Sequence, residues 1–273
     1  MPILRRSLPV SIVLLLLAVV VAQAHDLFLR PPSFFVTPGE TVRVRVLNGT
    51  FVKSESPVTF DRLRDLRVVG PAGTVRPDSA AWRVTRDSTV LTVSIGATGT
   101  YAIGTTLAPR ELTLAGKDFN KYLEEDGIPD VLDARRRNGE MEKPARERYV
   151  KSVKALLQAG DARSGAYATV FGHPAELVPL ENPYALRPGA ALRVRALVEG
   201  APVANQIVLS GGVSAAGDVI PEVSLRTDAA GLASIKLTKA GHWYVKFVNM
   251  VKATGEPAID YQSKWATLTF GVR

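Results

Sequence analysis

Short runs of alternating polar and β-branched residues, each closed by turn residues, constrain the fold of this chain most. Residues 41–46 read Thr-Val-Arg-Val-Arg-Val after a Pro-Gly pair, and residues 88–95 alternate in the same way before a second turn segment. Alternation with period two places one side of a segment in a core and the other toward solvent, as in antiparallel strands. The pattern predicts a β-sandwich over residues 25–110.

The last part of the chain, residues 164–273, repeats this pattern. Asp228-Ala229-Ala230-Gly231 is a tight-turn sequence that precedes a strand, and Lys239-Ala240-Gly241 leads into an aromatic strand. The expected strands are residues 168–171, 192–198, 206–209, 232–237, 243–248 and 265–270. Short strands at this spacing predict a second sandwich, of immunoglobulin or transthyretin type.

Residues 111–163, between the two sandwiches, are expected to form a helical linker. Two short helices are predicted over 119–125 and 131–137, with a Gly-Ile-Pro break between them. A longer helix is predicted over 144–159, because Pro144 would occupy its first turn and apolar residues recur at helical spacing. Its opposite side, which carries Lys151 and Lys154, would then be solvated. The predicted fold is mainly β, with two β-sandwich domains joined by a short helical segment.

The first 24 residues have the order of a secretory signal peptide. Arg5 and Arg6 precede an apolar run over residues 10–21, and Ala22-Gln23-Ala24 fits a cleavage site. A membrane anchor is the alternative, but the run is shorter than the about 20 apolar residues of a spanning helix. We expect a periplasmic or secreted protein that begins at His25 and has no stable membrane span after cleavage.

Composition argues against several classes of function. The chain has no cysteine, which excludes disulfides and thiolate metal sites. The net charge of +8 falls to +6 without the two arginines of the leader, and the basic residues are scattered, so nucleic acid is not an expected partner. Neither a glycine-rich phosphate loop nor a Gly-x-Ser-x-Gly nucleophile motif occurs, so the protein is not expected to be an enzyme.

The three histidines are the first candidates for metal ligands. His25, as the mature N-terminus, would offer its free α-amine and its ring Nδ1 to one ion, an arrangement that resembles the histidine brace of copper proteins. The amine must lose a proton whose pKa is about 8, so binding should weaken at lower pH. His173 could join His25 if the two domains fold back on each other; a surface-loop role is the alternative. His242, beside aromatic residues, is expected to pack.

Four segments together resemble one family of exported bacterial proteins. They are residues 24–29, 146–154, 172–184 and 260–270. In this order they are similar to the NikM-like family of periplasmic components of cobalt or nickel uptake, a domain of unknown function. The resemblance implies a metal-handling protein with His25 as a ligand and a membrane uptake system as its partner. Asn249 departs from the pattern, because members of the family often have His before Met at this point.

The first functional hypothesis is therefore a periplasmic binding protein for a divalent transition metal, namely nickel, cobalt or copper, with His25 and His173 as the metal ligands. The alternative is a non-enzymatic extracytoplasmic module whose loops bind a partner protein or a glycan. A third hypothesis, an oxidative copper enzyme acting on polysaccharide, would need a face of exposed aromatic residues, and the chain has only three tryptophans. The sequence leaves open whether the two histidines share a site.

Overall fold

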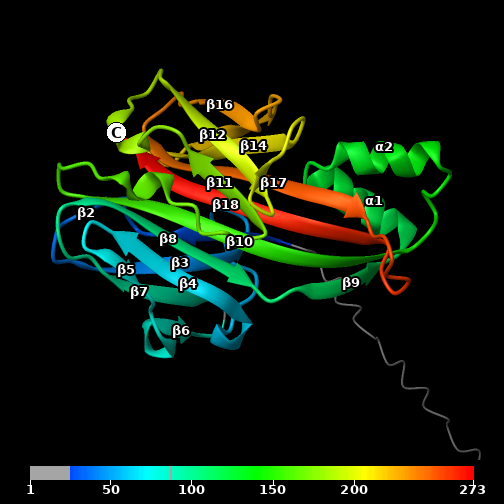
Figure 1. Cartoon of the computed structure of the whole chain (residues 1–273), viewed down its shortest axis with the longest axis horizontal. Coiled ribbons are helices and arrows are strands. Elements are labelled where there is room, and N and C mark those ends of the chain that lie inside the picture. The colour runs from blue at the N-terminus through cyan, green and yellow to red at the C-terminus, as the bar shows by residue number, and fades with distance from the viewer. Residues whose placement is uncertain (1–24, 87) are drawn as a thin grey trace, which may run out of the picture.

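The computed structural model describes residues 25–86 and 88–273, so the predicted signal peptide lies outside the described residues. These residues form three β-sheets, called here sheets A, B and C. The sheets stack in layers, with the long strands of sheet B in the middle (Figure 1). The mainly β fold predicted from the sequence is confirmed, while the immunoglobulin or transthyretin type of the sandwiches stays a prediction.

Sheet A is antiparallel and comes entirely from the N-terminal part of the chain. The alternation noted over residues 41–46 is borne out, because Val42, Val44 and Val46 are buried and the arginines between them are exposed. In spatial order its strands are β1 (Asp26–Arg30), β3 (Thr41–Gly49), β7 (Thr89–Ser94) and β6 (Trp82–Val84).

Sheet B combines strands from both halves of the chain. Its two central strands, β10 and β18, run parallel over Glu147–Ala155, and one continuous apolar core extends through both halves. The order is β15-β14-β17-β18-β10-β8-β4-β5, and the short β2 and β9 also pair with β10. The strands are β2 (Phe35–Val36), β4 (Leu63–Gly70), β5 (Gly73–Val75), β8 (Gly99–Leu107), β9 (Arg110–Leu114), β10 (Ala145–Ala159), β14 (Ile207–Ser214), β15 (Val219–Arg226), β17 (Gly241–Lys252) and β18 (Tyr261–Val272).

Sheet C covers part of sheet B from the side opposite to sheet A. It contains β11 (Ala175–Pro179), β12 (Ala191–Val198), β13 (Ala201–Pro202) and β16 (Leu232–Lys236). The strand predicted over 168–171 is wrong: residues Gly165–Ala168 form a short 3-10 helix. The backbone N–H of Phe171 donates to the carboxylate of Glu176, so that side chain takes the place of a neighbouring strand.

The helix predicted over 144–159 is also wrong, because these residues form the longest strand, β10. This strand lies inside sheet B and pairs with β18 on one side and with β8 and β9 on the other. Tertiary pairing thus overrides a helical apolar pattern. Lys151 and Lys154, expected in solvent, are only 5% and 2% exposed.

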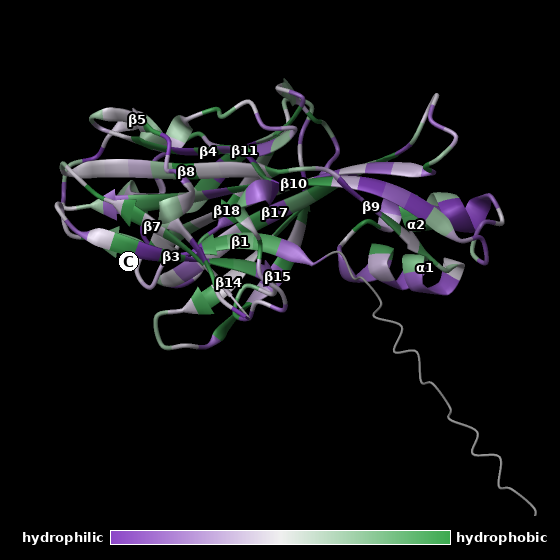
Figure 2. Ribbon diagram, turned by 90° about the horizontal axis from the view of Figure 1, so that it is seen from below, coloured by the Kyte–Doolittle hydropathy of each residue, from purple (hydrophilic) through white to green (hydrophobic). Residues whose placement is uncertain are grey.

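Two helices follow β9, as predicted: α1 (Gly116–Glu125) and α2 (Pro129–Arg137). They lie beside β9 at one end of the molecule (Figure 2). The apolar side of α1 packs on the strands, where Tyr122 stacks on Trp265 with ring centroids 6.1 Å apart. Gly127 between the helices has φ of +70°, a conformation that favours glycine. Within the described residues, no helix combines the length and apolar character needed to cross a membrane.

Candidate functional site

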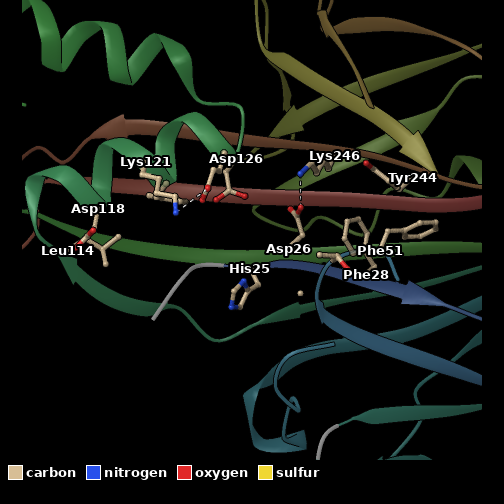
Figure 3. Close-up of a pocket in the computed structure, with 14 residues that line it drawn as sticks. His25, Asp26, Phe28, Phe51, Leu114, Asp118, Lys121, Asp126, Tyr244 and Lys246 are labelled. Atoms are coloured by element: carbon tan, nitrogen blue, oxygen red, sulfur yellow. Dashed lines mark hydrogen bonds and ion pairs between the residues drawn. The ribbon is translucent and has the colours of Figure 1, made fainter. Parts of the chain in front are cut away.

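His25 lines a cavity of about 410 Å³ between β1, β17, α1 and the turn that follows β3. Figure 3 shows Asp118, Lys121 and Asp126 on the side of α1 and the charged Asp26 and Lys246 in the middle. Phe28, Phe51 and Tyr244 form an aromatic wall at the other end. These three rings contact one another with centroids 5.0 to 5.3 Å apart. The cavity is therefore polar at one end and apolar at the other.

The imidazole of His25 is held by a carboxylate. Its Nε2 lies 2.8 Å from Oε2 of Glu55, and its side chain is 25% exposed. The backbone carbonyl of His25 accepts a hydrogen bond from the buried ammonium of Lys151 on β10. No described residue forms a hydrogen bond with Nδ1 of His25. The ring is thus oriented through Nε2, and the other ring nitrogen is available.

Asp26, the next residue, forms an ion pair inside the cavity. Its Oδ2 lies 2.6 Å from Nζ of Lys246 on β17, and Glu222 lies 3.6 Å from the same ammonium. Burial lowers the pKa of Lys246, but the carboxylates of Asp26 and Glu222 outweigh it and raise this pKa above its ordinary value. The lysine stays charged and fixes the carboxylate of Asp26.

Asp126 ends helix α1 and provides a second carboxylate in the cavity. Its side chain forms no hydrogen bond or ion pair with the described residues. Burial, followed by the negative charge of Asp26, raises the pKa of Asp126 well above its ordinary value. A cation bound between the two carboxylates would offset both effects.

A buried polar group lies beneath the cavity, behind Tyr122. Glu147 on β10 accepts hydrogen bonds from Tyr122 and Ser263 at Oε1, while its Oε2 has no partner among the described residues. Burial raises the pKa of Glu147 to about 7, although these hydrogen bonds lower it. Burial also disfavours the charged form of Lys151 and lowers its pKa to about 8.

His173 lies on the other face of sheet B. Its ring stacks on Phe171, and its Nε2 is 3.5 Å from Asp65 of β4. Phe171 also contacts Lys154 of β10, which is three residues from the lysine that bonds His25. Because successive side chains of a strand point to opposite faces, the structure does not bring His25 and His173 together. His173 is buried, and burial lowers its pKa, so it is neutral near pH 7.

The other residues considered from the sequence have structural contacts. His242 packs edge-on against Phe34 with centroids 5.0 Å apart, which agrees with the expected packing role. Asn249 donates to the side chain of Gln206, and Met250 is buried in the small core beneath α1. Among the described residues, no three His, Cys, Asp or Glu side chains form a group that could hold a metal ion.

Sequence reasoning missed Glu55, Asp126 and Lys246. Glu55 lies in a loop without any motif, and Lys246 meets Asp26 across 220 residues of sequence. Asp126 comes directly after the short helix predicted over 119–125, and no motif there singles it out. The sole local signal was the position of Asp26 directly after His25.

The chain belongs to a protein family of unknown function. The family described as "Domain of unknown function (DUF4198)" matches residues 22–250, which is most of the chain. This match places His25, Asp26, Glu55, Asp126 and Lys246 within the family domain. No curated protein matches the chain.

Two solved structures show a distant likeness to the chain. One is a tetra-tandem repeat in the extending region of a large adhesion protein, with 12% identity, 90% of this chain and 49% of that chain covered, and a TM-score of 0.23. Another is the BSP domain of a biofilm-associated protein, with 11% identity, 89% and 29% coverage, and a TM-score of 0.18. The chain thus spans less than half the length of either.

Proposed function

We propose that the protein is an exported, non-enzymatic binding protein for a divalent transition metal ion, which it carries as cargo in association with metal uptake. The ion would be nickel, cobalt or copper, because imidazole and amine nitrogens suit these metals. Cleavage before His25 would add an α-amine to the cavity, and this amine and Nδ1 of His25 would bind the ion together.

The close contact between Nε2 of His25 and the carboxylate of Glu55, at 2.8 Å, is the observation that carries the proposal. Metal-binding histidines usually donate their second ring N–H to a carboxylate, which orients the ring and raises its basicity. Here Nε2 faces the carboxylate of Glu55, which leaves Nδ1, the nitrogen that can form a chelate with the α-amine of the same residue. The carboxylates of Asp26 and Asp126 favour a cation nearby.

A form of the protein that keeps Ala24 ahead of His25 tests whether the terminal amine of His25 binds the metal. We expect protein that begins at His25 to bind Cu²⁺, Ni²⁺ or Co²⁺ about a hundredfold more tightly than protein that begins at Ala24, because two tethered ligands act as a chelate and one would be lost. Titration calorimetry on both forms, with their N-termini checked by mass spectrometry, measures this difference. Equal affinities would exclude the terminal chelate, and so would a secreted form cleaved at another bond.

Glu55→Gln should weaken metal binding about tenfold, because the amide is a poorer acceptor for the Nε2–H of His25 than the carboxylate. Glu125→Gln is the matched control, since this exposed residue lines the same cavity but pairs with Lys121. Calorimetry at pH 7.5 compares the two variants. An equal loss in both would mean that only the charge near the cavity matters, and not the orientation of the ring.

A further inference from the structure

The outward side of sheet A carries four arginines, Arg30, Arg43, Arg45 and Arg83, called here the arginine face. Arg30 of β1 is paired in register with Arg45 of β3, and both Arg45 and Arg83 of β6 are paired with the same residue of β7. Three arginines therefore form one line across four strands. Neighbouring strands are about 4.8 Å apart, so the line is about 14 Å long.

Within the described residues, the arginine face has no acidic partner. Arg43, Arg45 and Arg83 are exposed, and they form no ion pair or side-chain hydrogen bond with the described residues. The four strands contain one acidic residue, Asp26, and it pairs with Lys246 at the other end of β1. Like charges directly opposite each other destabilise a sheet, so this arrangement does not serve the fold. Burial lowers the pKa of Arg30, and the charge of Arg45 lowers it further.

We propose that the arginine face binds an anionic polysaccharide. Guanidinium groups form paired hydrogen bonds with carboxylate, phosphate or sulfate groups, and all four cations here are arginine rather than lysine. Hydroxyl side chains of Thr41, Thr92 and Ser94 also point outward from these strands and provide neutral hydrogen bonds for sugar hydroxyls. This binding is independent of the metal ion proposed at His25.

A polysaccharide fits the face better than an anionic bilayer does. Proteins that attach to a bilayer surface bury large apolar side chains in it. On the four strands of sheet A, the only large apolar side chain among those exposed is Val84, at 41%. A linear chain laid across the strands, by contrast, would pass the exposed Arg45 and Arg83 and the half-buried Arg30, whose guanidinium also donates to the carbonyl of Phe51.

Neutralising three arginines together tests the proposal. In the triple variant Arg43→Gln, Arg45→Gln, Arg83→Gln, we expect binding to polygalacturonate to fall about tenfold, since each exposed ion pair contributes modestly. The matched control is Lys117→Gln, Arg137→Gln, Lys239→Gln, which removes the same charge from exposed cations elsewhere and should change binding less than twofold. Neutral dextran should not bind. Biolayer interferometry at two salt concentrations measures each affinity.

Several results would overturn the proposal. Equal losses in the triple variant and its control would mean that only net charge matters. Equal binding of dextran would mean that the interaction does not depend on anionic groups. Stronger binding to vesicles of phosphatidylglycerol than to polygalacturonate would indicate that the face binds a membrane surface instead. Thermal melting of both variants shows that they fold, and His25→Ala should retain full polysaccharide binding, which separates this site from the metal site.

Discussion

Lys154→Met should lower the free energy of unfolding by about 3–5 kcal/mol, a large part of the stability of a typical domain. Lys154 lies 2.6 Å from Glu176, and the two side chains are 2% and 3% exposed. Without the ammonium, the carboxylate stays buried, and its remaining donors among the described residues are the backbone N–H groups of Phe171 and Gly172. The variant therefore keeps a buried charge that lacks its partner, and urea unfolding at pH 7 measures the loss.

A double variant shows whether the charge is responsible. Lys154→Met combined with Glu176→Gln removes both charges, so we expect it to be about 2 kcal/mol more stable than Lys154→Met alone. Lys264→Met, which breaks a partly exposed pair with Glu199, should cost less than about 1 kcal/mol. If the double variant is no more stable than Lys154→Met, the loss comes from packing and not from the unpaired carboxylate.

Strand β10, which carries Lys154, shows how far the sequence could predict the fold. Alternating segments such as Thr41–Val46 were recognised because their pattern and turns are local, and the two short helices were recognised from their Gly-Ile-Pro break. Strand β10 was missed because its partner β18 is more than 100 residues away in the sequence. Its buried lysines bond groups from other segments, so nothing near them in the sequence signalled burial.

The candidate site was predicted in part for a similar reason. His25 was selected because its chemistry as a terminal residue depends only on the cleavage site. The acceptor for its ring, Glu55, and the cation beside it, Lys246, come from a loop and from β17, and folding alone brings them to β1. His173 was selected by residue type, but alternation along β10 places its contacts on the opposite face.

Glu147→Gln should change the pH dependence of stability by about 3 kcal/mol. Burial raises the pKa of Glu147 from 4.5 to about 7, so the folded protein holds a proton that the unfolded chain has lost. Glu147 therefore contributes its full stability below about pH 4.5, and this contribution falls as the pH rises to about 7, by about 1.4 kcal/mol per unit. The glutamine cannot ionise, so relative to the wild type it should gain about 3 kcal/mol between pH 4.5 and 8.

Urea unfolding of both proteins across this pH range tests the expectation, because groups that titrate in both proteins, such as Asp126, largely cancel in the difference. Glu124→Gln, an exposed change in helix α1, is the matched control for the loss of one carboxylate. If the difference in free energy of unfolding between Glu147→Gln and the wild type does not vary with pH, the carboxylate ionises freely in the folded protein. Since Oε2 has no partner among the described residues, that result would require water to reach Glu147 beneath the cavity of His25.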